Sequence, residues 1–202
     1  MPSLAQVGID TLLSDDPQLN VRLVKGKSPT RVVLDSTLRA PLAARALRST
    51  GGEAGGDSGG GGRPAAAVVT LQRSLCGSAA CRRAAELRRR GVRVLAVAAD
   101  AAGRPALPRL LPLLADRLRI RSLMVEGGAA VIGACVRDNV VGRVLLTLAP
   151  TLASGVRPAF GVGDGGEKGG VGLAAPQFRL EEVETVQLGD DVVVTGIPTR
   201  RA

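Results

Sequence analysis

Short apolar runs alternate with helical segments through most of this 202-residue chain, and this alternation restricts the fold more than any other feature. Each run has the length and the unbroken apolar character of a strand that is covered on both faces. The predicted strands are Arg31–Asp35, Ala66–Leu71, Val92–Ala98, Ser122–Val125 and Val144–Ala149. The predicted helices are Ser78–Arg90, Leu107–Leu118 and Ala129–Asp138. We therefore predict an α/β domain in three layers with a mainly parallel central sheet, closed by an antiparallel pair over Gln177–Gln187 and Asp191–Gly196.

One proline conflicts with this interpretation. Pro108 suits the first turn of the helix over Leu107–Leu118, where the missing N–H would be unpaired in any case. Pro112 falls inside the same helix, where a proline costs about 3 kcal/mol. We therefore expect this helix to kink or to start later.

The chain length suits a single domain over residues 1–202. Residues 51–64 are rich in Gly, with Asp, Glu and Ser between, and such a composition cannot bury apolar surface. We interpret them as a disordered insertion in a surface loop. Such an insertion is tolerated because the entropy of closing a loop grows slowly with its length.

The composition argues against several classes of function. The chain has no His and no Cys-x-x-Cys pair among its three cysteines, so we predict no metal site and no Ser-His or Cys-His catalysis. The net charge of +9 would suit nucleic acid, but aromatic side chains that could stack on bases are almost missing. An Arg-rich surface and a small anionic ligand explain this charge better. We predict no nucleic-acid partner and, because no apolar run is long enough, no membrane span.

Cysteine usage also bears on location. An odd cysteine count and no visible secretory signal predict a reducing compartment, the cytoplasm, with the plastid stroma as an alternative.

The sequence Glu126-Gly127-Gly128 lies between a predicted strand and a predicted helix. Glycines let the backbone turn sharply and approach a ligand closely, and the start of the helix offers unpaired N–H groups to an anion. The sequence is neither a P-loop nor a Gly-x-Gly-x-x-Gly fingerprint. Two interpretations therefore stay open on this motif alone, a phosphate or nucleotide site and a plain strand–turn–helix junction.

The segment from Gly8 to Arg22 contains a second concentration of polar groups. Asp15-Asp16-Pro17 has the composition of a capped turn. The same segment also places a hydroxyl, a carboxylate, an amide and a guanidinium in what we expect to be one loop, and Arg22 could clamp a phosphate through paired N–H donors. These groups belong to Thr11, Asp15, Asn20 and Arg22.

Three ordered motifs carry a resemblance to a known family. They are the segment 11–22, the segment 31–39 and the segment 123–129, and Ala149-Pro150 and 157–161 continue the match. Together they resemble the reductase domain of riboflavin biosynthesis, from Gly8 to about Gly196. The resemblance implies a dihydrofolate-reductase-like fold and a homodimer. It also implies reduction, with NADPH, of the ribosyl group of a pyrimidine ribosylamine 5′-phosphate.

The resemblance also implies the roles of individual residues. Asp15 would orient or protonate the substrate as the catalytic residue, and Leu19, Arg22 and Glu126 would bind the substrate. Residues that would contact NADPH are Thr11, Asp15, Ser36, Gly128, Ala129, Ala130, Val131, Ile132, Gly133 and Ala134. The substrate would be 5-amino-6-(5-phosphoribosylamino)uracil or its 2,5-diaminopyrimidinone counterpart.

This sequence also departs from the family pattern. Family members carry a strand, a loop and a helix before the position of Gly8, and Met1–Val7 is too short to supply them. We therefore expect either a fragment or a chain that has lost part of its sheet and pocket. Two alternatives to the reductase stay open, an inactive nucleotide-binding fragment and a reductase of the same fold that acts on another substrate, such as a pterin.

Overall fold

The computed structural model describes residues 4–48, 64–152 and 178–200. The expected insertion at 51–64, except Pro64, and the motif at 157–161 lie outside these residues. In chain order the strands are β1 (Leu4–Gly8), β2 (Thr30–Leu34), β3 (Ala66–Leu71), β4 (Arg93–Val97), β5 (Leu123–Gly127), β6 (Val144–Leu148), β7 (Phe178–Leu188) and β8 (Asp191–Arg200). The α-helices are α1 (Ile9–Asp15), α2 (Ser78–Arg89), α3 (Leu107–Leu118) and α4 (Ala129–Arg137). Arg45–Leu47 and Gln72–Cys76 form short 3₁₀ helices.

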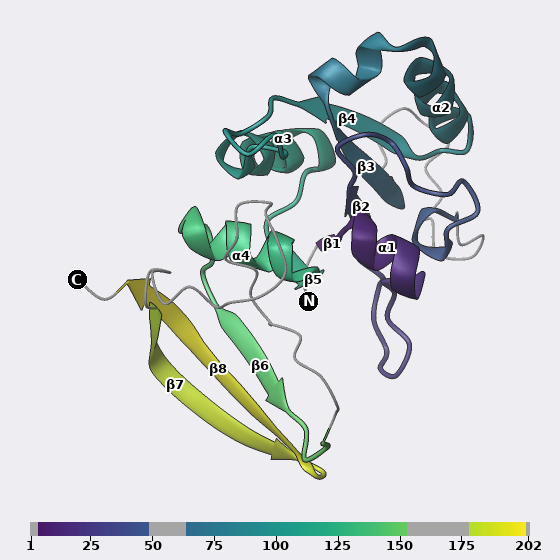
Figure 1. Ribbon diagram of the computed structural model, residues 1–202. Helices are drawn as coiled ribbons and strands as arrows, with labels where there is room; N and C mark the ends of the chain where they lie inside the picture. Colours follow the sequence, from purple (N-terminus) through teal and green to yellow (C-terminus); the bar gives the residue numbers. More distant parts are fainter. Residues whose placement is uncertain (1–3, 49–63, 153–177, 201–202) are drawn as a thin grey trace.

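Five strands form a parallel sheet in the order β4-β3-β2-β1-β5. Its three middle strands are buried along their whole length. On one face the sheet packs against α1 and α2, through residues such as Leu12 and Leu87. On the other face it packs against α3 and α4, through residues such as Leu110 and Cys135. Figure 1 shows this sandwich of helices, sheet and helices, which confirms the predicted three-layer α/β fold.

A second sheet is antiparallel and has the order β6-β8-β7. The long β7–β8 hairpin is the predicted closing pair, and its start at Gln177 lies outside the described residues. The predicted strand Val144–Ala149 forms as β6, but it pairs with β8 rather than with the parallel sheet. In Figure 1 this sheet extends away from the three-layer body. Its position follows from pairing along the hairpin, which sequence periodicity alone does not encode.

The N-terminal segment differs from the expectation of one polar loop. Leu4–Gly8 forms a central strand of the parallel sheet, and Thr11 and Asp15 lie on helix α1, so only the residues from Asp16 onward form the loop. Asp16 ends the helix with a left-handed φ of 40°, and its N–H donates to the Leu12 carbonyl. The turn predicted from Asp15-Asp16-Pro17 is therefore the end of a helix.

The expectation for Pro112 is partly wrong. Helix α3 begins at Leu107 and continues through Pro112 to Leu118, so it does not start later. Its leucines at positions 107, 110, 114 and 118 are all buried against the sheet. Burial of this apolar stripe offsets the lost hydrogen bond. No helix in the described part of the chain is long and apolar enough to cross a membrane.

Candidate functional site

The carboxyl ends of β5 and β1 meet beside the starts of two helices. Gly128 stands between β5 and α4 with a φ of +81°, a conformation that favours glycine. A Cβ atom at Gly128 would lie 3.2 Å from the Thr11 hydroxyl oxygen. A Cβ atom at Gly8 would lie 3.0 Å from a Val131 methyl carbon. The starts of α1 and α4 therefore lie close together, and Thr11 and Gly128 are close neighbours.

The remaining residues predicted on α4 divide by environment. Ala130 is exposed, and Ala129 and Ile132 are partly exposed, in the first turns of the helix. The first backbone N–H groups of a helix have no hydrogen-bond partner within it. Gly133 and Ala134 are buried, and the Ala134 side chain packs in the core beneath the helix. The start of α4 is thus open to a ligand, whereas its second turn contributes packing.

Ser36 follows β2 at the same edge of the sheet. Its carbonyl accepts hydrogen bonds from the Thr70 hydroxyl at 3.1 Å and the Ser74 hydroxyl at 2.7 Å. The buried Asp35 carboxylate accepts a hydrogen bond from the Ala40 N–H at 2.7 Å. These bonds hold the loop after β2 in place beside the strand ends, although Ser36 does not line the cavity described next.

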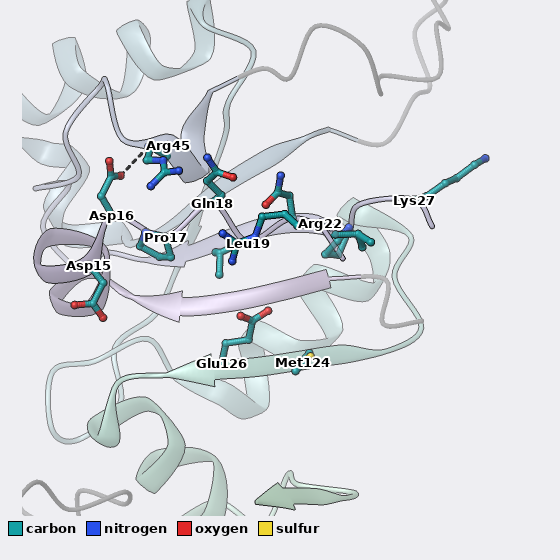
Figure 2. A pocket seen from close by; sticks show the side chains of 13 residues that line it. Asp15, Asp16, Pro17, Gln18, Leu19, Arg22, Lys27, Arg45, Met124 and Glu126 are labelled. Carbon is teal, nitrogen blue, oxygen red and sulfur yellow. Dashed lines mark hydrogen bonds between the residues drawn. The ribbon is translucent and has the colours of Figure 1, made fainter. Parts of the chain in front are cut away.

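A cavity of about 420 Å³ lies between the loop after α1 and strand β5. Figure 2 shows Asp15 near one end, Lys27 extending outward at the other, and Leu19, Arg22 and Glu126 between them. The residues that line it are Asp15, Asp16, Pro17, Gln18, Leu19, Asn20, Val21, Arg22, Lys27, Pro29, Arg45, Met124 and Glu126. The structure therefore brings together the predicted catalytic residue and all three predicted substrate residues.

The loop that forms the upper wall is held by its own contacts. The Asp16 carboxylate accepts a hydrogen bond from the Arg45 N–H at 2.8 Å. Leu19 adopts a left-handed φ of 51°, and its side chain is buried in the core on the α1 face. The Ser28 hydroxyl accepts a hydrogen bond from the Val21 N–H at 3.3 Å. This anchoring leaves the Arg22 side chain exposed at the cavity.

Glu126 is the ionisable group whose environment is most altered in this cavity. Loss of hydration raises the pKa of the Glu126 carboxyl above its ordinary value, and the positive charge of Arg22 acts in the opposite direction. In Figure 2 its carboxylate points from β5 toward the loop that carries Leu19 and Arg22. Glu126 can therefore form a hydrogen bond with a ligand in the cavity.

Sequence reasoning missed several lining residues, of which Lys27 and Arg45 add positive charge. Neither stands in a motif, because only the fold brings Arg45 beside the loop that ends α1. Lys27 had one available signal, since it is one of three lysines in the chain and follows the Arg22 loop. Among the described residues no group of three or more His, Cys, Asp or Glu side chains could hold a metal ion.

Comparison with known proteins places this geometry in a family. Residues 5–194 match the family described as the RibD C-terminal domain. The chain is 33% identical to the 2,5-diamino-6-ribosylamino-4(3H)-pyrimidinone 5′-phosphate reductase of Methanothermobacter thermautotrophicus, over 93% of this chain and 76% of that protein. It is 29% identical to the riboflavin biosynthesis protein RibD of Actinobacillus pleuropneumoniae, over 95% of this chain and 45% of that protein. The chain thus spans about half the length of the RibD relatives it matches.

A solved structure agrees with these sequence relatives. The RibD of Acinetobacter baumannii has a TM-score of 0.67 and 26% identity, over 98% of this chain and 47% of that one. The fold, the motifs at the strand ends and the family match over nearly the whole length agree with one another. This chain therefore belongs to the RibD C-terminal domain family.

Proposed function

We propose that this chain is a reductase of riboflavin biosynthesis that acts, with NADPH, on a pyrimidine ribosylamine 5′-phosphate. The observation that carries this proposal is the juxtaposition of a glycine turn and a cavity lined by both basic and acidic side chains at one edge of the parallel sheet. In open α/β sheets, ligands bind at the carboxyl ends of the strands. A related protein is named as the 5′-phosphate reductase of a diaminopyrimidinone, which is one of the two substrates that the family resemblance leaves open.

The substrate phosphate would lie at the end of the cavity that carries Arg22 and Lys27 (Figure 2). Arg22 offers paired N–H donors, and Lys27 adds a second positive charge. A pterin carries no phosphate, so these two cations favour a phosphorylated substrate over a pterin. The pyrimidine and ribose would then extend toward Glu126 and Asp15.

The glycine turn at Gly128 and the start of α4 would bind the pyrophosphate of a dinucleotide. Gly128 has no side chain to keep a ligand away from the turn, and the first N–H groups of α4 can bind an anion. Thr11 and the residues Ala129–Ile132 would hold the phosphates, and Ser36 would contact the adenosine half. When bound, NADPH supplies the hydride that reduces C1′ of the sugar.

The protein would hold the hydride-carrying carbon of NADPH next to C1′ of the sugar and would supply one proton. Reduction of the ring-opened imine form of the substrate at C1′ would require one proton at the imine nitrogen and would give a ribityl amine. Asp15, at the end of α1, would orient the sugar or supply this proton. Glu126 would form a hydrogen bond with the substrate from the β5 side of the cavity.

The test measures NADPH oxidation with the phosphorylated substrate. Arg22→Ala should raise KM about tenfold to a hundredfold, because a charge-assisted hydrogen bond contributes about 1.5–3 kcal/mol. Its affinity for NADPH, measured by calorimetric titration, should change little. Lys25→Ala is a control, because Lys25 is exposed outside the cavity. Equal losses of substrate and NADPH affinity would contradict the phosphate clamp, and NADPH binding without turnover would favour the inactive nucleotide-binding alternative.

We also propose that a second copy covers the β6–β8–β7 sheet. Large apolar side chains are exposed on both of its faces, with Leu145, Val186 and Leu188 on one and Leu146 and Leu148 on the other. Exposure of several large apolar side chains on one small sheet is typical of a surface that another protein covers. Sedimentation equilibrium should report twice the chain mass, and a monomer at all concentrations would contradict this proposal.

A further inference from the structure

A second cavity, of about 620 Å³, lies outside the proposed substrate pocket, between helix α2 and the loop that follows β2. We call it the α2 groove. It is lined by Thr37, Leu38, Leu42, Ala79, Ala80, Arg82, Arg83, Glu86 and Arg89. None of these residues lines the substrate cavity or is needed for the reduction proposed above.

The charge of the α2 groove is positive. Its one carboxylate, Glu86, already forms ion pairs with Arg89 and Arg90. These contacts, with the Arg90 hydrogen bond foremost, lower the pKa of the Glu86 carboxyl. Glu86 is therefore ionised at neutral pH, and its charge is paired with Arg89 and Arg90. Within the described residues no carboxylate lies within 4.0 Å of the Arg82 or Arg83 guanidinium. The groove therefore has two cationic side chains without an acidic partner in the described structure.

One of these arginines also shapes the wall. Arg83 donates hydrogen bonds to the Ala40 and Arg39 carbonyls, which ties α2 to the loop after β2. Its Nε atom is buried and has no hydrogen-bond partner among the residues that the structure describes. Within the same residues Arg82 makes no such contact, and it is exposed at the groove. Arg83 thus fixes the wall, and Arg82 is available to a ligand.

The α2 groove lies next to the proposed cofactor site, at the same edge of the parallel sheet. The parallel sheet places β5, β1, β2 and β3 side by side in that order. Gly128 follows β5, Thr11 follows the end of β1, and Ser36 follows β2. The next strand, β3, leads into α2, and Thr37, directly after Ser36, lines the groove. A dinucleotide extended along these strand ends from Gly128 to Ser36 would have its adenosine end at the groove.

From this arrangement we infer that the α2 groove binds a phosphate monoester carried by the adenosine half of the cofactor, and so selects NADPH over NADH. The inference rests on the proposed function, because it assumes that a dinucleotide occupies the strand ends. Arg82 would pair with the phosphate, and the Thr37 hydroxyl could donate to a phosphate oxygen. NADH lacks this phosphate and would leave Arg82 in contact with water only.

The experiment compares Arg82→Gln with Arg88→Gln. Arg88 is exposed on the same helix but does not line the groove, so its variant controls for the loss of one positive charge. Affinities for NADPH, NADH, 2′,5′-ADP and inorganic phosphate are measured by titration calorimetry at low and high salt. Circular dichroism verifies that each variant folds.

Arg82→Gln should weaken NADPH and 2′,5′-ADP binding about tenfold and leave NADH affinity unchanged, whereas Arg88→Gln should change neither. Parallel losses for NADPH and NADH, or equal effects of the two variants, would overturn the groove assignment while the proposed reductase stands. Binding of inorganic phosphate to the wild type as strong as that of 2′,5′-ADP would overturn the link to the cofactor. A wild-type protein that binds neither dinucleotide would refute the proposed function, and the groove assignment with it.

Discussion

Both sheets of this molecule contain strands rich in apolar residues, but these strands lie in opposite environments. Strands β1 to β3 are rich in Val, Leu and Ala, and so are β6 and β8. The first group is fully buried because helices cover both faces of its sheet, whereas β6 and β7 expose most of their residues. An apolar segment therefore predicts a strand. Whether that strand is buried, and so stabilises the fold, depends on the helices or sheets that pack against it.

The largest expected effect is the difference in stability loss between truncating a core leucine and truncating a leucine of the second sheet. Leu114 is 0% exposed beneath the parallel sheet, and Leu145 is 61% exposed on β6. Leu114→Ala should lower the free energy of unfolding by about 2–5 kcal/mol, because it leaves a cavity in the core. Leu145→Ala should cost less than about 0.5 kcal/mol in dilute protein, as is usual for a surface substitution. Urea unfolding measures both.

The same two variants can be compared at several protein concentrations. If a second copy covers the β6–β8–β7 sheet, the cost of Leu145→Ala should rise with protein concentration, because dimerisation stabilises only the folded chain. The cost of Leu114→Ala should stay constant. A Leu145→Ala cost that matches that of Leu114→Ala in dilute protein would show that the second sheet is as well covered as the first.

Much of the parallel sheet could be predicted from sequence. Ala66–Leu71 and Leu107–Leu118 have the predicted bounds, because each is a strongly apolar segment with a clear end. Strand β1 was missed because Gln6 interrupts its apolar run, yet Gln6 is 0% exposed in the sheet. Its side-chain amide is buried without a hydrogen-bond partner within the described residues. Such burial depends on neighbouring strands that a local pattern does not contain.

The candidate site was predictable only in part. On physical chemistry alone the Glu126-Gly127-Gly128 turn left an anion site and a plain strand–turn–helix junction both open, whereas the roles of Thr11, Leu19 and Ser36 came from the family resemblance. Arg45 reaches the cavity through tertiary contacts, so no spacing in the sequence could have indicated it, whereas the position of Lys27 shortly after Arg22 was an available signal.

Alkaline pH should lower the stability of the three-layer body, because one buried thiol ionises less readily in the folded chain than in the unfolded chain. Cys135, on α4, packs in the core, and burial raises its pKa from the ordinary 9.0 to about 11. The folded chain therefore holds this proton more tightly than the unfolded chain. Stability should be unaffected below about pH 9 and should fall as the pH rises toward 11, by a total of about 2–3 kcal/mol.

Urea unfolding from pH 8 to pH 11 measures this loss, with Cys135→Ala as the control. The variant has no thiol at this position, so its stability should fall less over the same range, although cavity formation lowers its value at every pH. Cys76 and Cys81 are exposed and serve as internal controls for alkylation, since both should react with iodoacetamide at pH 8 while Cys135 does not. Identical pH profiles for the variant and the wild type would exclude Cys135 as the cause.

The smallest effect should distinguish a turn in the body from a turn in the second sheet. Gly128 and Gly189 both have positive φ, +81° and +63°, but only Gly128 has a side chain nearby. Gly189→Ala should cost about 1 kcal/mol, because it forces an L-residue into the left-handed region. Gly128→Ala should cost somewhat more, because its Cβ would lie 3.2 Å from the Thr11 hydroxyl oxygen. It should also weaken NADPH binding, which Gly189→Ala should leave unchanged. Thermal unfolding and NADPH titration of the two variants measure these effects, and equal NADPH affinities would remove the glycine turn from the cofactor site.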